Sequence, residues 1–217
     1  MLKFVVNQAQ MNAVLIAIIV LNVIISYKGF NDLNFFRKYE FHIGSTRAGE
    51  QIRMLSSAFL HADFMHLGFN MLTLYFFAPV VIAYLGSFSF AIIYLGSLLF
   101  GSLLTLWFHK DEYSYRAIGA SGAVTGVLYS AILFEPDMSI NFIPAYIFGI
   151  LYLLFSIYGM QSKKGNIGHT AHFGGAIGGY LITLVYVPQM LTMNTNTVII
   201  LAIPIVILFV MAKLGKL

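Results

Sequence analysis

Cysteine is absent from this 217-residue chain, and charged residues make up only 9% of it. Without cysteine there can be no disulfide, thiolate nucleophile, cysteine zinc site or iron–sulfur cluster. A soluble domain usually carries about 25% charged residues. Eight acidic and twelve basic side chains cannot cover a globule of this size, and they offer no basic stripe to a phosphate backbone. The composition therefore argues against a water-soluble enzyme, a disordered chain and a nucleic-acid binder.

Apolar residues make up 59% of the chain, and the mean hydropathy is +0.85. A membrane helix needs about 20 mostly apolar residues. We therefore expect an all-α, polytopic helical bundle forming a single membrane-embedded domain over residues 1–217, with a core at about 11–187 and a further C-terminal transmembrane helix at about 197–212. The candidate spans are Met11–Tyr27, Phe64–Leu85, Phe88–Phe108, Ser121–Phe134, Phe142–Tyr158, His172–Val187 and Thr197–Ala212.

Polar residues inside membrane spans are costly and often functional, and three clusters of them stand out. The first, from His61 to Asn70, opens the second span. Asp63 is a candidate N-cap, which would leave His61 in the loop and put His66 in the first helical turn. His66 and Asn70 are four residues apart, so they share one helix face.

The other two clusters open the fourth and sixth spans. They are Gly119-Ala-Ser121-Gly122 and the segment from His169 to Gly179, which contains His172. Because the second, fourth and sixth spans enter the bilayer from the same side, the polar residues of their first turns should meet at similar depth. We therefore expect His66, Asn70, Ser121 and His172 to converge.

The fourth span has only 14 residues, about 21 Å of helix against a hydrocarbon core of about 30 Å. Its beginning should lie below the membrane surface, with unpaired N–H groups. Ser121 would then be a nucleophile beside oxyanion donors, and a histidine from another span could remove its proton. Glycines would let the fourth and sixth helices approach closely: Gly122 and Gly126 in the fourth, Gly175 and Gly179 in the sixth. The pair in the sixth helix has the small-xxx-small spacing of close helix contacts.

Each residue also has a plainer interpretation. A lone serine in a membrane helix usually bonds its own i−4 carbonyl, a histidine at a helix end is often interfacial, and Asn70 alone is more often a helix–helix contact. A transporter would need polar groups through the whole depth, yet the inner halves of these spans are apolar. No His-Glu-x-x-His string occurs, which argues against a zinc enzyme, and the spans hold no pair of carboxylates, which an aspartyl enzyme would need. We expect no metal and no cofactor.

Over roughly 52–187 these clusters resemble the rhomboid family of intramembrane serine proteases. The shared motifs are His61-x4-His66-x3-Asn70, Gly119-x-Ser121-Gly122 and Ala171-His172-x2-Gly175-x3-Gly179.

The resemblance implies a rhomboid-like six-helix core and a Ser–His dyad without a carboxylate. Ser121 would be the nucleophile and His172 the general base. The side chains of His66 and Asn70, with the Ser121 N–H, would hold the oxyanion. The supporting residues implied are His61, which braces its loop, Gly119, which shapes the turn before the nucleophile, Arg53, Gly122, Gly175 and Gly179.

The implied substrates are single-span transmembrane proteins, cut in or next to their helices. Membrane lipids would surround the protein, and no nucleic acid would be involved. The implied location is the bacterial plasma (inner) membrane, which the chain would cross several times. The alternative is a non-catalytic relative that binds or dislocates membrane proteins, and the presence of both Ser121 and His172 argues against it.

Two residues depart from the family pattern, and the distribution of Lys and Arg departs from the pattern usual in membrane proteins. Ile52-Arg53 stands where Trp-Arg is common, and Thr125 stands where many members carry an aromatic that packs against the catalytic histidine. The resemblance also implies a cytoplasmic N-terminus. Lys3 alone would then lie inside and the other eleven Lys and Arg outside, which opposes the positive-inside tendency.

Overall fold

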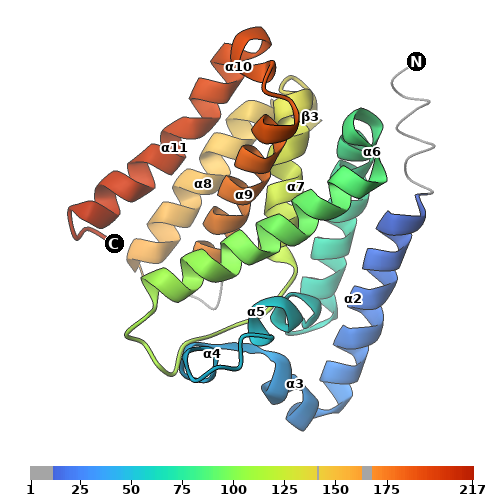
Figure 1. Cartoon of the computed structure of the whole chain (residues 1–217), viewed down its shortest axis with the longest axis vertical. Coiled ribbons are helices and arrows are strands. Elements are labelled where there is room, and N and C mark those ends of the chain that lie inside the picture. Colours follow the sequence, from blue (N-terminus) through green and yellow to red (C-terminus); the bar gives the residue numbers. More distant parts are fainter. Residues whose placement is uncertain (1–11, 141, 163–167) are drawn as a thin grey trace.

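The computed structural model describes residues 12–140, 142–162 and 168–217 of the chain, and it is a bundle of helices (Figure 1). In chain order the helices are α2 (Ala13–Asn31), α3 (Leu33–Tyr39), α4 (Ile43–Arg47), α5 (Arg53–Ser56), the short 3-10 helix η1 (Ser57–Phe59), α6 (Phe64–Phe108), α7 (Ser121–Phe134), α8 (Ala145–Ser162), α9 (His169–Tyr186), α10 (Met190–Met193) and α11 (Thr195–Lys213). The predicted all-α class is confirmed.

Two short strand pairs accompany the helices, and the sequence did not predict them. Strand β1 (Phe41–His42) pairs antiparallel with β2 (Arg116–Ala117), and β3 (Ser139–Ile140) pairs antiparallel with β4 (Ile143–Pro144). The first pair ties the segment after α3 to the loop that leads into α7. It therefore holds the approach to the predicted nucleophile.

Helix α6 contains the second and third predicted spans as two arms that fold back on each other. At Gly86 the backbone has φ 79° and ψ 170°, which reverses the chain direction between the arms (Figure 1). Glycine reaches a positive φ without the steric cost that a Cβ adds. The second and third predicted spans therefore form a tight hairpin.

The boundaries of three predicted spans need correction. The first predicted span begins at Met11, outside the described residues, whereas α2 begins at Ala13, capped by Asn12, and runs on to Asn31. Helix α8 begins at Ala145 rather than Phe142, because the β3–β4 hairpin occupies the residues before it.

The third correction concerns the sixth predicted span. Helix α9 begins at His169 rather than His172, since the His172 N–H already donates a helical hydrogen bond to the Gly168 carbonyl at 3.1 Å. The difference matters for the site, because it places His172 within the first turn of a formed helix and not at its free end.

Helix α7 lies at the centre of the bundle. It occupies the predicted range, and its residues from Gly122 to Leu133 are all buried. Helices α6 and α9 pack against it, and α11 lies beside α8 on an outer side (Figure 1). The Tyr180 hydroxyl of α9 donates to the Val198 carbonyl of α11 at 3.0 Å, which fixes the C-terminal helix to the core. The short apolar helix is thus enclosed by protein.

Among the described residues, α2, α6, α8 and α11 are long and apolar enough to cross a membrane. Large apolar side chains such as Val185, Phe155 and Leu103 are exposed on the outside of the bundle, as lipid contact requires. The protein is an integral membrane protein. The number of crossings stays a prediction, since α7 is shorter than a full span.

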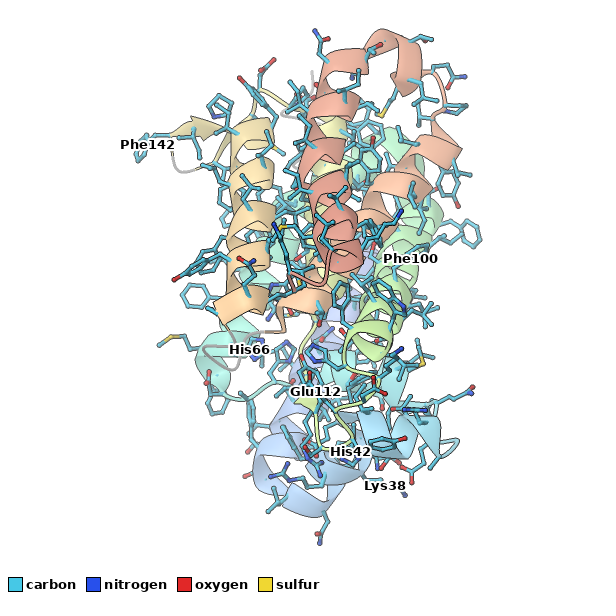
Figure 2. All side chains as sticks on the ribbon, turned by 90° about the vertical axis from the view of Figure 1, so that its left-hand side faces the viewer. Lys38, His42, His66, Phe100, Glu112 and Phe142 are labelled. Atoms are coloured by element: carbon cyan, nitrogen blue, oxygen red, sulfur yellow. The ribbon has the colours of Figure 1, made fainter. Side chains whose placement is uncertain are left out.

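Charged residues of both signs gather in the loops at one end of the bundle. In Figure 2, Lys38 and His42 lie at one end and Phe142 at the other. Arg116 of the loop before α7 pairs with Glu40 of the first loop, and Arg47 donates to the Lys110 carbonyl, so the two loops lie together at the end with Lys38. Glu135 and Asp137 instead follow the other end of α7. The described Lys and Arg residues in or beside these two loops are Lys28, Arg37, Lys38, Arg47, Arg53, Lys110 and Arg116.

Candidate active site

A cavity of about 800 Å³ opens beside these charged loops, and it brings together the four polar residues expected to converge. Ser121 is the first residue of α7, His172 lies in the first turn of α9, and His66 and Asn70 lie in the first two turns of α6. The rest of the lining includes Ala62, Asp63, Tyr115, Ile118 and Gly168.

Ser121 and His172 are both half-buried and both face this cavity. In the described part of the chain, the Ser121 and His172 side chains do not form a hydrogen bond with each other. In enzymes without substrate such bonds are often long and shorten only in the reacting complex. The arrangement is therefore compatible with a nucleophile and base that engage when substrate binds.

A tyrosine that the sequence reasoning missed lies against His172. The Tyr152 hydroxyl of α8 is 3.0 Å from His172 Nδ1, and the two rings are stacked, with centroids 5.8 Å apart and an interplanar angle of 24°. The Thr125 hydroxyl donates to the Ser121 carbonyl at 2.7 Å and lies 3.3 Å from the Tyr152 hydroxyl. The one sequence signal for Tyr152 was Thr125 itself, because it stands where many family members carry an aromatic against the catalytic histidine.

His66 and Asn70 both present hydrogen-bond donors. The N-cap predicted at Asp63 is confirmed, since its carboxylate accepts from the His66 N–H at 2.7 Å. His66 Nδ1 accepts from the Ala62 N–H at 3.4 Å, so its ring hydrogen lies on Nε2. Asn70 Nδ2 donates one hydrogen to the His66 carbonyl at 2.9 Å and keeps a second for another acceptor.

Gly119 lies directly beneath His66. Its φ is +112°, and a Cβ on it would be 2.8 Å from His66 Cε1 and Nε2. Its N–H donates to the Ser57 carbonyl at 3.0 Å. A larger residue would be strained in its backbone and would also push His66 aside. Glycine therefore lets the chain pass under the imidazole just before it reaches Ser121.

His61 connects α2 to the beginning of α7. The Ser26 hydroxyl donates to the Phe59 carbonyl at 2.9 Å, so His61 Nδ1–H is the donor in its 2.8 Å contact with Ser26. His61 Nε2 then accepts from the Ala120 N–H at 3.4 Å, one residue before Ser121. These contacts give His61 a bracing position in the loop before α6.

The bracing by His61 predicts a pH dependence of stability. Burial, with a smaller effect of His66, lowers the pKa of His61 from 6.5 to about 3. Between those values the unfolded chain binds a proton here that the folded protein does not. The free energy of unfolding should therefore fall as the pH is lowered from 6.5 towards 3, by up to about 1.4 kcal/mol per pH unit.

Thermal unfolding in detergent at several pH values checks this expectation. His61→Gln keeps hydrogen-bonding groups but cannot be protonated, so its unfolding midpoint should fall less steeply with decreasing pH than that of the wild type. An identical pH slope in the two proteins would show that His61 is not the titrating group.

The predicted close approach of α7 and α9 is present. A Cβ on Gly175 would collide with the Gly122 carbonyl oxygen, and one on Gly179 with the Gly126 carbonyl oxygen. Backbone therefore packs on backbone between these helices, which brings Ser121 and His172 to the same cavity.

Arg53 holds the first loop together. Its buried guanidinium donates to the carbonyls of Arg37 at 2.8 Å and Glu40 at 3.0 Å, and to the Glu50 carboxylate at 2.6 Å. Ile52 is 60% exposed and contributes little to the anchoring. The loop is thus fixed by the arginine without the aromatic common in the family pattern.

The carboxylates near the cavity have other partners. Glu40 pairs with Arg37 at 3.2 Å and with Arg116, and Asp63 caps α6. No group of three or more His, Asp or Glu residues with metal-site geometry occurs in the described part of the chain. An acidic third member beside His172 is therefore not provided by these two residues.

Comparison with known proteins identifies relatives of this chain. The family model described as the Rhomboid domain matches residues 48–189. The putative rhomboid protease YdcA of Bacillus subtilis is 31% identical over 149 residues, which cover 65% of this chain and 70% of that protein. The rhomboid protease AarA of Providencia stuartii is 27% identical over 160 residues, 64% of this chain and 57% of its own.

A mitochondrial relative is similar to the same degree. Rhomboid protein 1, mitochondrial, of Saccharomyces cerevisiae is 31% identical over 140 residues, 60% of this chain and 40% of that protein. The aligned regions cover less than two thirds of the yeast and Providencia proteins. The similarity therefore concerns the membrane core that contains the cavity.

Proposed function

We propose that this chain, which belongs to the rhomboid family, is an intramembrane serine endopeptidase. Its substrates would be single-span transmembrane proteins, cut in or next to their helices. The observation that carries the proposal is a polar cavity lined by Ser121, His172, His66 and Asn70 at the enclosed beginning of α7. Relatives named as proteases, YdcA and AarA among them, support it.

The reaction begins at the serine hydroxyl. His172 Nε2 takes the proton from Ser121 Oγ as the oxygen attacks the scissile carbonyl carbon. The carbonyl π-electrons move to the oxygen, which becomes an oxyanion near the Ser121 N–H, His66 Nε2–H and the free Asn70 Nδ2–H. Such donors stabilise the charge that develops in the transition state. His172 then gives its proton to the leaving amine, and the peptide bond breaks.

Water completes the cycle. His172 removes a proton from a water molecule as its oxygen attacks the acyl group on Ser121, and the proton returns to the serine oxygen when the ester breaks. A substrate helix hides its carbonyls in internal hydrogen bonds and in lipid. The scissile segment must therefore unwind into the cavity, which favours helix-breaking and small residues at the cut.

The proposal includes the surroundings of the enzyme. We place it in a bacterial plasma membrane, crossed many times and in contact with lipid along its apolar outer surface. Single-span proteins would reach the cavity from the bilayer.

Reconstitution in liposomes with a model single-span substrate tests the proposal. Wild-type protein should cut the substrate once, near its helix, whereas Ser121→Ala and His172→Ala should not. Cleavage that survives Ser121→Ala would sink the serine mechanism. A wild type that neither cuts nor reacts at Ser121 with a fluorophosphonate probe would favour the non-catalytic alternative.

Removing one oxyanion donor is expected to slow the chemical step. Asn70→Ala should lower kcat about 10²-fold, as loss of a single donor does in other serine proteases, with little change in KM. Asn22→Ala is the control, because Asn22 of α2 bonds the Tyr94 hydroxyl away from the cavity. A drop in kcat of equal size in both variants would mean that Asn70 acts only through stability.

A further inference from the structure

We propose that Thr125 and Tyr152 form a hydroxyl relay that starts at the Ser121 carbonyl and holds His172 with its ring hydrogen on Nδ1. The inference rests on the proposed function, since it explains how the general base is positioned. It gives positioning roles to two residues on different helices, α7 and α8, neither of which contacts substrate in the reaction described above.

The relay consists of three consecutive contacts. The Thr125 hydroxyl is 2.7 Å from the Ser121 carbonyl oxygen, and 3.3 Å from the Tyr152 hydroxyl. The Tyr152 hydroxyl is in turn 3.0 Å from His172 Nδ1. Thr125 is 3% exposed, so its hydroxyl has no bulk water to bond instead. The nucleophile's own carbonyl is therefore linked to the base through two side chains.

Counting hydrogens fixes the direction of the relay. A carbonyl oxygen only accepts, so the Thr125 hydrogen goes to Ser121. The Tyr152 hydroxyl must then donate to Thr125 Oγ1, because threonine has no second hydrogen to give. With its only hydrogen used, the tyrosine oxygen can meet His172 only as an acceptor. All three contacts are satisfied together only when His172 carries its hydrogen on Nδ1.

This assignment gives His172 the state that a general base requires. With the hydrogen on Nδ1, Nε2 keeps its lone pair and can take the Ser121 proton. In Ser-His-Asp enzymes a buried carboxylate fixes this tautomer, and its loss is costly. The two carboxylates lining this cavity, Glu40 and Asp63, have other partners. Here the neutral hydroxyls of Thr125 and Tyr152 orient the His172 imidazole instead, and the stacked Tyr152 ring limits its rotation.

The relay also explains the departure at Thr125. At this position many family members carry an aromatic that packs against the histidine, whereas this chain has a small hydroxyl residue. The aromatic ring comes instead from Tyr152 of α8. The two residues are therefore interpreted as a compensating pair, in which the threonine is useful because Tyr152 is present.

Four variants test the relay in the reconstituted cleavage assay. Thr125→Val and Tyr152→Phe remove one hydroxyl each and keep the shape, so each should lower kcat about 10- to 100-fold, part of the 10²–10⁴ that a general base contributes. KM should change little. Thr125→Ser keeps the hydroxyl and should stay within about threefold of wild type, whereas Tyr152→Leu also removes the ring and should lose at least as much activity as Tyr152→Phe.

A spectroscopic measurement reports the tautomer independently of turnover. In protein labelled with ¹⁵N-histidine, the His172 signals, identified by their loss in His172→Ala, should show a protonated Nδ1 and an unprotonated Nε2 at neutral pH. Thr125→Val and Tyr152→Phe should move these shifts towards a mixture of tautomers, and Thr125→Ser should not. Thermal unfolding midpoints of the variants separate this effect from loss of folding.

The outcomes distinguish the relay from the proposed function. If wild type cuts through Ser121 but Thr125→Val and Tyr152→Phe cut equally well, or if His172 carries its hydrogen on Nε2, the relay is wrong and the protease stands. If wild type does not cut, or if Ser121→Ala still cuts, the proposed function is wrong whatever the His172 shifts show.

Discussion

Ser121→Ala is expected to lower cleavage of a reconstituted single-span substrate by at least about 10⁴-fold, to the background of the assay. The variant removes the oxygen that forms the acyl-enzyme, and loss of the catalytic serine in a dyad or triad costs nearly all the catalysis that these residues supply together. Initial rates at saturating substrate, measured for equal amounts of folded protein, give the ratio.

Ser130→Ala is a matched control on the same helix. Ser130 is buried nine residues further along α7, where its hydroxyl lies 2.7 Å from the Thr183 hydroxyl, outside the cavity lining. Its loss should cost about 1 kcal/mol of stability and leave cleavage close to wild type. Equal loss of activity in the two serine variants would mean that the assay reports damage to the folding of α7 and not the loss of the nucleophile.

Labelling separates the two candidate functions. Wild-type protein should react at Ser121 with a fluorophosphonate, and His172→Ala should react far more slowly because the base is gone. A non-catalytic relative that binds membrane proteins would retain a substrate equally well with and without Ser121→Ala and would not be labelled.

Gly175→Val is expected to have the largest effect on stability. A Cβ at this position would collide with the carbonyl and Cα of Gly122, which are backbone atoms and cannot rotate away. Overpacking against side chains typically costs 1–3 kcal/mol. Against rigid backbone we expect at least about 3 kcal/mol, and the separation of α7 from α9 should also abolish cleavage. Thermal unfolding in detergent measures the loss.

Gly68→Ala is the control for this prediction. Gly68 is also inside a helix, but a Cβ there would meet nothing within 4 Å. Since alanine is favoured over glycine in a helix interior by about 1 kcal/mol, this variant should be as stable as wild type or slightly more so. If Gly175→Val unfolded at the same temperature as Gly68→Ala, the α7–α9 contact would not be the rigid element that the structure indicates.

The helices were predictable because lipid imposes a length and a composition on each span. Helix α7 has the predicted bounds, and Gly86 turns α6 between the second and third predicted spans. The beginnings of α8 and α9 were not predictable, because a strand pair precedes the first and a hydrogen bond to Gly168 extends the second. Such end effects depend on contacts that apolar runs do not encode.

The candidate site divides in the same way. Order and spacing put His66, Asn70, Ser121 and His172 at the entrances of alternate helices, and the structure brings them to one cavity. No spacing indicated Tyr152, which lies on α8 far from the motifs. The missing aromatic at Thr125 showed only that something was lacking there.

The sequence by itself determined that this protein resides in lipid and which few polar side chains its core can offer, because the scarcity of charge leaves almost no others. The tertiary structure alone decided which of them touch: His61 between α2 and α7, glycine backbone between α7 and α9, and Tyr152 against His172. The physical reason is that a hydrogen bond between helices depends on distance and donor direction, which packing sets and residue spacing does not.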